Sequence, residues 1–213
     1  MKFDEFSKQV LKVKNLPLPG EESHYKMEPE IRKAWREKRS KPSHRPKEAA
    51  VMAVCYADSN GFTNLLLILR KTYQGVHSNQ IGFPGGKVEN EDRDLMHTAL
   101  RETHEEVGIA PERLTVLKSL TQVYIPPSNF LVQPFLAIAE GPMTFVKQQE
   151  EVEALVEVPL VDIMDDTNRI AQQLSTSYAQ NISVPAFKLN GYVVWGATAM
   201  MLNEIRDLFK KSL

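Results

Sequence analysis

The segment around residues 92–108 constrains the fold most, because its residues repeat with the period of an α-helix. One face collects apolar or small side chains, namely Met96, Ala99, Leu100, Thr103 and Val107. The other side collects three carboxylates, Glu102, Glu105 and Glu106. Such a helix packs one face on a core and presents the other to solvent or to a cation. The pattern predicts a helix over about 92–107, which Gly108 ends as a C-cap.

Short apolar runs rich in Val, Leu and Ile surround this helix and predict a strand-rich core. The runs at 49–56 and 64–69 are separated by Asp58-Ser59-Asn60-Gly61, which favours a turn, so we expect a hairpin there. Further candidate strands are 114–120, 123–125, 130–138 and 153–158. Residues 195–211 place apolar side chains at helical spacing, which predicts a second helix near the end of the chain.

The length of 213 residues suits one domain with a sizeable core and is short for two substantial domains. Residues 1–47 are polar and interrupted by proline. They contain one short amphipathic stretch, made by Phe3, Phe6, Val10 and Leu11. A charged run at 32–39 offers a surface for an anionic ligand, although a solvated face is the commoner explanation. We expect residues 1–47 to form a leader that packs on a main domain of residues 48–213.

The charge balance argues against large anionic partners. With 26 basic and 27 acidic side chains, the formal net charge is -1, so no global field attracts nucleic acid or an anionic membrane. The single cysteine, Cys55, lies in an apolar run, where we expect a buried thiol and no catalysis. The charged start of the chain has no continuous apolar stretch like that of a secretory signal, so we expect a cytoplasmic location.

The three carboxylates of the predicted helix need a reason to be close together. At spacings of three and four residues they repel one another by a few tenths of a kcal/mol per pair. A solvated surface helix is one explanation. A hard divalent cation such as Mg²⁺ or Mn²⁺ is the other, since it takes oxygen ligands and a diphosphate supplies more of them. Two features favour the cation: Arg101 stands four residues before Glu105, and the glycine-rich segment 82–87 lets backbone approach a ligand.

These residues resemble the Nudix box. Its positions are occupied by Gly86, Arg101, Glu102, Thr103, Glu105, Glu106, Gly108 and Ile109. Asp92 stands at the first glutamate position, with one extra residue before Arg101. This departure is similar to the coenzyme A diphosphatase branch, whose Phe-Pro-Gly-Gly element corresponds to residues 83–86. In the upstream element of that branch His77 and Gln80 match, whereas Gln74-Gly75 and Asn79 differ.

The resemblance implies an α/β Nudix fold, with a mixed β-sheet between helices. It implies metal ligation by Glu102 and Glu106, with Glu105 as a further ligand directly or through water, and a catalytic role for Glu105. Arg101 would be a catalytic residue that orients these carboxylates. A metal-activated water would attack phosphorus, so no nucleophilic side chain is needed. From the acidic loop 148–153 we choose Glu151 as the general base, although a solvated loop explains this acid equally well.

The predicted substrate contacts come from three loops. They are His77, Gln80, Gly85, Gly86, Ser128 and Asn129. The last two lie in a proline-rich loop between candidate strands, where loops on a rigid scaffold commonly carry specificity. For the aromatic residues of that loop, Tyr124 and Phe130, packing into the core is the better-supported alternative.

The leading hypothesis is hydrolysis of a small nucleoside-diphosphate derivative, namely coenzyme A or an acyl derivative, to 3′,5′-ADP and a 4′-phosphopantetheine product. Hydrolysis of ADP-ribose or of a dinucleotide such as NADH is the enzymatic alternative. A non-catalytic nucleotide-sensing module is an alternative of another class, but it would not need Arg101, Glu102, Glu105 and Glu106 all intact. The sequence leaves both a monomer and a homodimer open.

Overall fold

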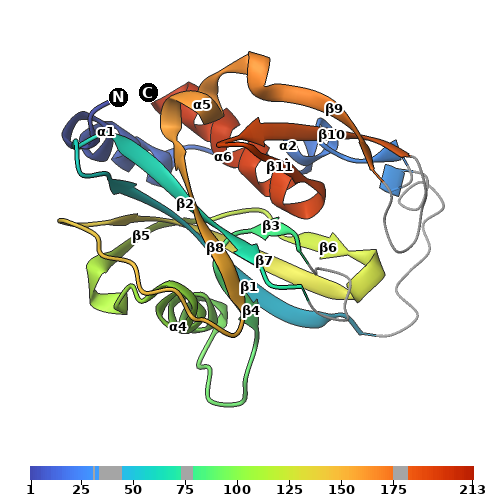
Figure 1. The fold of residues 1–213 in the computed structure, drawn as a ribbon, viewed down its shortest axis with the longest axis horizontal. Helices are drawn as coiled ribbons and strands as arrows, with labels where there is room; N and C mark the ends of the chain where they lie inside the picture. The colour runs from blue at the N-terminus through green and yellow to red at the C-terminus, as the bar shows by residue number, and fades with distance from the viewer. Residues whose placement is uncertain (31, 34–44, 73–78, 175–181) are drawn as a thin grey trace.

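A mixed β-sheet forms the centre of the molecule (Figure 1). The computed structural model describes residues 1–30, 32–33, 45–72, 79–174 and 182–213. The strands of this sheet in the described residues are β1 (Lys47–Ala57), β2 (Thr63–Arg70), β3 (Ile81–Gly82), β4 (Gly85–Lys87), β5 (Leu114–Ser119), β6 (Val123–Ile125), β7 (Phe130–Ala139) and β8 (Val152–Pro159). β1 pairs antiparallel with β2 and β4 and parallel with β7. The expected hairpin, with Val54 opposite Leu66, is confirmed.

Helices cover both faces of the sheet, which confirms the predicted α/β arrangement (Figure 1). Among the residues that the structure describes, the α-helices are α1 (Phe3–Val10), α2 (Glu21–Tyr25), α4 (Leu95–Val107), α5 (Leu160–Met164) and α6 (Gly196–Ser212). The 3₁₀ helices in the same ranges are η1 (Leu11–Asn15), η2 (Pro111–Arg113), η3 (Pro126–Ser128) and η4 (Asp166–Asn168). A second sheet consists of β9 (Arg169–Leu174), β10 (Ile182–Leu189) and β11 (Tyr192–Trp195). α4 covers one face of the main sheet, whereas α6, α1 and α2 lie on the other.

The alternation of side chains along β1 divides the core into two layers. Ala50, Met52 and Val54 pack in the layer that contains Ala99 and Val107 of α4. Ala49, Ala53 and Cys55 pack in the layer that contains Leu202 and Phe209 of α6. Cys55 is a free, fully buried thiol whose pKa burial raises, so it is an inert core residue as expected.

The N-terminal segment contributes side chains to the layer beneath α6. Phe3, Phe6 and Val10 of α1 are buried there. The ring of Phe6 meets that of Phe209 edge to face, with the ring centroids 5.4 Å apart. Leu11 is exposed, because the chain turns into η1 at that residue. The division of the chain at residue 47 stays a prediction. None of the described helices combines the length and the apolar character needed to cross a lipid bilayer.

The helix that carries the carboxylates begins later and packs on a different strip than predicted. Asp94 caps it by accepting a hydrogen bond from the backbone N–H of His97 at 2.7 Å, so α4 starts at Leu95. The expectation that Met96 lies on the packing face was wrong, since 40% of it is exposed. The buried residues of α4 are Thr98, Ala99, Thr103, Glu106 and Val107. The buried strip of α4 is rotated relative to the predicted one because Glu106, which hydropathy places on the outside, is buried against Arg70 of β2 and the N–H of Gly85 in β4.

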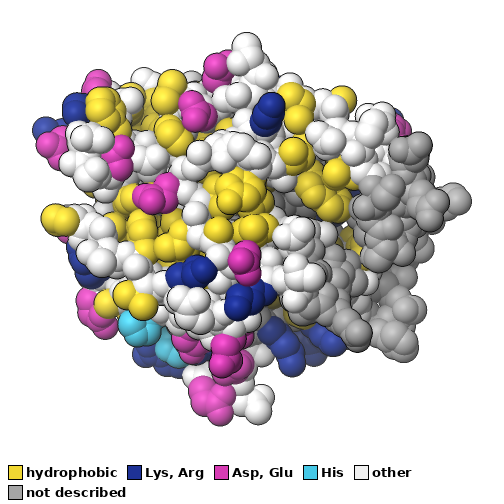
Figure 2. All heavy atoms as spheres, in the orientation of Figure 1, with side chains coloured by type: hydrophobic (Ala, Val, Ile, Leu, Met, Phe, Trp, Pro, Cys, Tyr) yellow, Lys and Arg dark blue, Asp and Glu magenta, His cyan; other side chains and the backbone are white. Residues whose placement is uncertain are grey.

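Charged side chains gather on the part of the molecule that carries α4 and β4. Figure 2 shows acidic and basic groups side by side there, whereas hydrophobic side chains are more frequent elsewhere on this face. Because the net charge of the whole chain is only -1, this local concentration is what matters for binding a phosphate or a cation.

Candidate active site

Two glycines in β4 let α4 lie directly against the sheet. Gly85 has a φ of 147°, and a Cβ there would lie 2.3 Å from the carbonyl oxygen of Ala50 in β1. A Cβ on Gly86 would lie 2.3 Å from a carboxylate oxygen of Glu102. Side-chain carbons do not tolerate such approaches, so the Glu102 carboxylate lies against bare backbone. Glycine is therefore needed at both positions for the acids of α4 to reach β4.

Glu106 is a buried carboxylate whose loss of hydration is only partly offset by hydrogen bonds and by a nearby positive charge. Its side chain is 2% exposed, and the backbone N–H of Gly85 donates a hydrogen bond to Oε2 at 2.8 Å. Oε1 lies 3.4 Å from Nη1 of Arg70 and accepts no hydrogen bond from the described residues. Burial raises the pKa of Glu106 to about 7, against the lowering effects of Arg70 and the Gly85 N–H. The charges of Glu102 and Glu151 raise this pKa further.

Glu102 is the second carboxylate of the site. Burial raises its pKa, and the nearby Arg101, whose Nη1 donates to Oε1 at 3.1 Å, opposes that rise. The charges of Glu105 and Glu151 raise the pKa of Glu102 as well. The charge of Glu102 is among the causes that raise the pKa of Glu106, so the two carboxylates lie within electrostatic reach of each other. A cation between them would relieve their repulsion.

Arg101 orders the start of this helix through a buried carboxylate. Its Nε and Nη2 each donate to Asp92 at 2.9 Å, and the Asp92 side chain is fully buried. Asp92 also accepts hydrogen bonds from Oγ1 of Thr98 and from the backbone N–H of Glu89, both at 2.9 Å. The Arg101 hydrogen bonds lower the pKa of Asp92 well below its usual range. Nη1 of Arg101 lies 3.0 Å from Glu105, which confirms the expected pair four residues apart.

The loop that carries Glu151 is tied to the end of α4. The backbone N–H of Gln148 donates to the carbonyl of Glu106 at 3.0 Å, and its side-chain Oε1 accepts from the N–H of Glu151 at 2.6 Å. The charge of Glu151 raises the pKa of both Glu102 and Glu106, so its carboxylate lies within electrostatic reach of both. This placement supports the choice of Glu151 from the acidic loop, although its role as the base stays a prediction.

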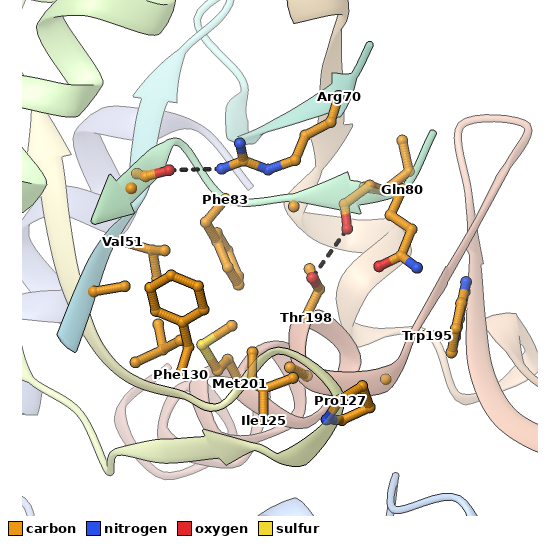
Figure 3. A pocket seen from close by; sticks show the side chains of 18 of the residues that line it. Val51, Arg70, Gln80, Phe83, Ile125, Pro127, Phe130, Trp195, Thr198 and Met201 are labelled. Carbon is orange, nitrogen blue, oxygen red and sulfur yellow. Dashed lines mark hydrogen bonds between the residues drawn. The ribbon is translucent and has the colours of Figure 1, made fainter. Parts of the chain in front are cut away.

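A pocket of about 300 Å³ opens beside β4, on the α6 side of the sheet (Figure 3). Apolar side chains form much of its wall, including Val51, Phe83, Ile125, Phe130 and Met201. Arg70 lies on one side with its Nη2 donating to the carbonyl of Gly85 at 2.6 Å. Because Arg70 also lies beside Glu106, it connects the pocket with the carboxylates.

Three of the predicted substrate contacts line this pocket. They are Gln80, Gly85 and Gly86. In Figure 3 the side chain of Gln80 lies next to the indole of Trp195. The predicted contact His77 lies outside the described residues.

The proline-rich loop supplies different residues than predicted. Ser128 and Asn129 are not among the described residues that line the pocket. Asn129 has a positive φ of 53° and accepts a hydrogen bond from Tyr124 at 2.9 Å, so its side chain holds the loop itself. The lining residues of this loop are Ile125, Pro126, Pro127 and Phe130. Pro126 and Pro127 lie in η3, whereas Ile125 ends β6 and Phe130 begins β7. The roles of Ser128 and Asn129 as substrate contacts stay predictions.

Sequence reasoning missed the wall made by Arg70 and by the start of α6. Arg70 ends the apolar run of β2, and a cation at that place was the one available signal. Trp195 and Thr198 come from a segment far along the chain. The Thr198 hydroxyl donates to the carbonyl of Ile81 at 2.9 Å and thereby fixes α6 to β3 (Figure 3).

The donor set fits a hard divalent cation. Carboxylate oxygens are its preferred ligands, and the Glu106 oxygen without a hydrogen bond belongs to a carboxylate within electrostatic reach of Glu102. Glu105 is turned toward Arg101, with 53% of its side chain exposed. Within the described ranges, no three acidic, histidine or cysteine groups already converge on one point. A cation would therefore be completed by water and by phosphate oxygens, as Mg²⁺ sites usually are.

The sequence profile of the NUDIX domain matches residues 46–176, more than half of the chain. The chain belongs to the Nudix family and is a Nudix hydrolase, in agreement with its mixed sheet, the glycines of β4 and the glutamates of α4. Among solved structures it is similar to a Nudix hydrolase from M. smegmatis, RenU, at 17% identity and a TM-score of 0.53. The match covers 78% of this chain and 87% of that one, and it shows the shared fold.

Relatives of this chain include coenzyme A diphosphatases. It is 32% identical over 159 residues to the mitochondrial coenzyme A diphosphatase NUDT8 of Homo sapiens, which covers 74% of this chain and 67% of that protein. It is 29% identical over 163 residues to the mitochondrial Nudix hydrolase 15 of Arabidopsis thaliana, covering 74% of this chain and 57% of that protein.

Alanine at the two glycines of β4 is expected to impair different properties, stability at Gly85 and activity at Gly86. Gly85→Ala forces a Cβ into β1 backbone, so it should cost about 3 kcal/mol of stability or more. Gly86→Ala meets only the end of the Glu102 side chain, so it should cost under about 1 kcal/mol but lower kcat/KM by roughly 100-fold through misplacement. Thermal unfolding and steady-state kinetics check both. Equal losses of stability would contradict this account of β4.

Proposed function

We propose that this Nudix hydrolase cleaves the diphosphate of coenzyme A or an acyl derivative, giving 3′,5′-ADP and (acyl-)4′-phosphopantetheine. The observation that carries the chemistry is the pair of crowded carboxylates, Glu102 and Glu106, whose pKa values are both raised. They lie against β4, whose glycines also line the pocket. The choice of substrate is supported by the 32% identity to a coenzyme A diphosphatase and by the spacing from Asp92 to Arg101.

Glu102 and Glu106 would hold a Mg²⁺ or Mn²⁺ ion, with Glu105 as a further ligand directly or through water. When bound, such an ion neutralises diphosphate charge and lowers the pKa of a bound water. Asp92 anchors the guanidinium of Arg101, and Arg101 in turn pairs with Glu102 and Glu105 and keeps both carboxylates in place. Arg101 thus acts as a positioning residue in this proposal.

The remaining groups act on the proton and on the substrate. Glu151 would accept the proton of the attacking water, since its charge already reaches the space between Glu102 and Glu106. Arg70 would pair with a phosphate oxygen, because it joins the pocket to Glu106. The departing phosphate leaves as part of a product, and no covalent enzyme intermediate forms.

A substrate panel tests the proposal. Coenzyme A, acetyl-coenzyme A, ADP-ribose and NADH are incubated with Mg²⁺ or with Mn²⁺, and the products are separated by chromatography. We expect cleavage of the coenzyme A compounds to 3′,5′-ADP, with kcat/KM at least about tenfold above that for ADP-ribose or NADH. Addition of EDTA should stop the reaction.

The other outcomes of the panel are equally informative. Preference for ADP-ribose or NADH would overturn the substrate assignment and keep the diphosphate chemistry. Binding of these nucleotides without turnover, at any metal concentration, would indicate the nucleotide-sensing alternative. Turnover that EDTA does not affect would contradict the proposed use of Glu102 and Glu106.

A further inference from the structure

The pocket takes wall residues from both sides of the matched domain: the start of α6 follows it in the chain, and residues 29 and 32 precede it. Pro29 and Arg32 line the pocket, although the family profile matches only residues 46–176. The Arg32 side chain is 14% exposed. Its Nη2 donates a hydrogen bond to the carbonyl of Tyr124 in β6, and its Nε lies 4.0 Å from a carboxylate oxygen of Glu28. The guanidinium is therefore held against the proline-rich loop rather than extended into solvent.

A buried polar network fixes the segment that leads to these two preceding wall residues. His24 of α2 lies 3.1 Å from Glu204 of α6, and both side chains are almost fully buried. Glu204 also accepts hydrogen bonds from the N–H and the hydroxyl of Thr121, at 3.1 and 2.6 Å. Nearby, the amide of Asn203 donates to the carbonyl of Ser23 at 2.9 Å. These buried hydrogen bonds link α2 to α6 and hold the chain before Pro29 in one place.

Cationic side chains lie on opposite walls of the pocket, and the carboxylates nearest to them, Glu28 beside Arg32 and Glu106 beside Arg70, are not among its lining residues. Its lining includes Arg32, Arg70 and Lys87 and, among the described lining residues, no carboxylate. Figure 3 shows Arg70 across the pocket from Ile125 and Pro127. Arg32 is bound to the residue that precedes Ile125, so it belongs to the wall that faces Arg70. Apolar side chains lie between the two cations.

This arrangement suits a ligand with two separate anionic groups joined by a less polar part. Arg70 lies beside the carboxylates and so serves the diphosphate. We infer that Arg32 binds a second phosphate, the 3′-phosphate on the ribose of coenzyme A. The assignment of this phosphate rests on the proposed function, and it separates coenzyme A from ADP-ribose and NADH, which lack that group. A guanidinium binds phosphate oxygens through charge-assisted hydrogen bonds.

The test compares coenzyme A with 3′-dephospho-coenzyme A, which keeps the diphosphate. Arg32→Gln is expected to raise KM for coenzyme A by about 10- to 100-fold, with kcat nearly unchanged, because a charge-assisted contact is lost. KM for the dephospho compound should change less than about twofold. Arg32→Lys should give an intermediate KM. Lys33→Gln, which removes an exposed neighbouring cation, is the matched control and should resemble the wild type.

Failure of this inference is distinct from failure of the proposed function. Equal effects of Arg32→Gln on both substrates, or none on either, would overturn the role of Arg32. If the wild type does not cleave coenzyme A, the proposed function fails, and calorimetric binding of 3′,5′-ADP and 5′-AMP still tests Arg32. The wild type should then bind the bisphosphate at least about tenfold more tightly, and Arg32→Gln should remove that difference. Thermal melting shows whether Arg32→Gln is folded.

Discussion

Glu106→Gln is expected to lower kcat/KM by about 100-fold or more without unfolding the protein. Glutamine keeps an oxygen that can accept the hydrogen bond from Gly85, so the contact between α4 and β4 survives. It removes the charge with which the proposed site would bind a metal ion. Steady-state kinetics with Mg²⁺ or Mn²⁺, together with thermal unfolding in EDTA, measures the two effects separately.

The same variant should be more stable than the wild type in EDTA at alkaline pH. Burial raises the pKa of Glu106 from 4.5 to about 7, so folding favours the protonated form. The wild type therefore loses stability as the pH rises from 4.5 through 7, by roughly 3 kcal/mol at most, and Glu106→Gln does not. The stabilities of the two proteins should converge below pH 4.5.

Glu105→Gln is a matched control, since the carboxylate of Glu105 is on the same helix but is half exposed and paired with Arg101. We expect its stability in EDTA to stay within about 0.5 kcal/mol of the wild type across this pH range. If Glu106→Gln kept full activity, the proposed site would be wrong. If it unfolded in EDTA at pH 8, the account of the buried charge would be wrong.

Asp92→Asn is expected to destabilise the protein by about 3 kcal/mol or more and to lower activity through the displacement of Arg101. The Asp92 side chain is fully buried and accepts two hydrogen bonds from Arg101. An amide cannot accept both, and it leaves the guanidinium without its counter-charge. Chemical denaturation gives the loss of free energy, and kinetics gives the loss of activity.

Glu89→Gln provides the comparison, because Glu89 also lies near Arg101 but at 4.0 Å and with 60% of its side chain exposed. Its loss should cost under about 0.5 kcal/mol. The pKa of Asp92 is lowered in the folded state, so its contribution is complete well above 3.8 and disappears as the pH falls below that value. Wild type and Asp92→Asn should therefore differ most near neutral pH and least in acid. An equal cost for Asp92→Asn and Glu89→Gln would contradict this assignment.

Much of the main sheet, and the helix α4 that bears the three glutamates, could be predicted from local sequence patterns. The hairpin of β1 and β2, the later strands and the end of α4 at Gly108 follow from alternation, turn residues and helical spacing. The residues of the Nudix box lie at fixed spacings within one continuous segment, so the motif can be recognised from the sequence alone. The misplacement of Met96 marks the limit, since hydropathy alone cannot anticipate which helical strip meets a polar partner.

Which elements form and which acids share a helix can be deduced from the sequence, because both depend on residues close together in the chain. The burial of Glu106 depends instead on tertiary contacts, with Arg70 in β2 and with the Gly85 amide in β4. The pocket depends on tertiary contacts too, since it joins Arg32 near the start of the chain to Trp195 near its end. Contacts between such distant segments leave no periodic signal, because they are fixed by how the layers pack and not by local conformation.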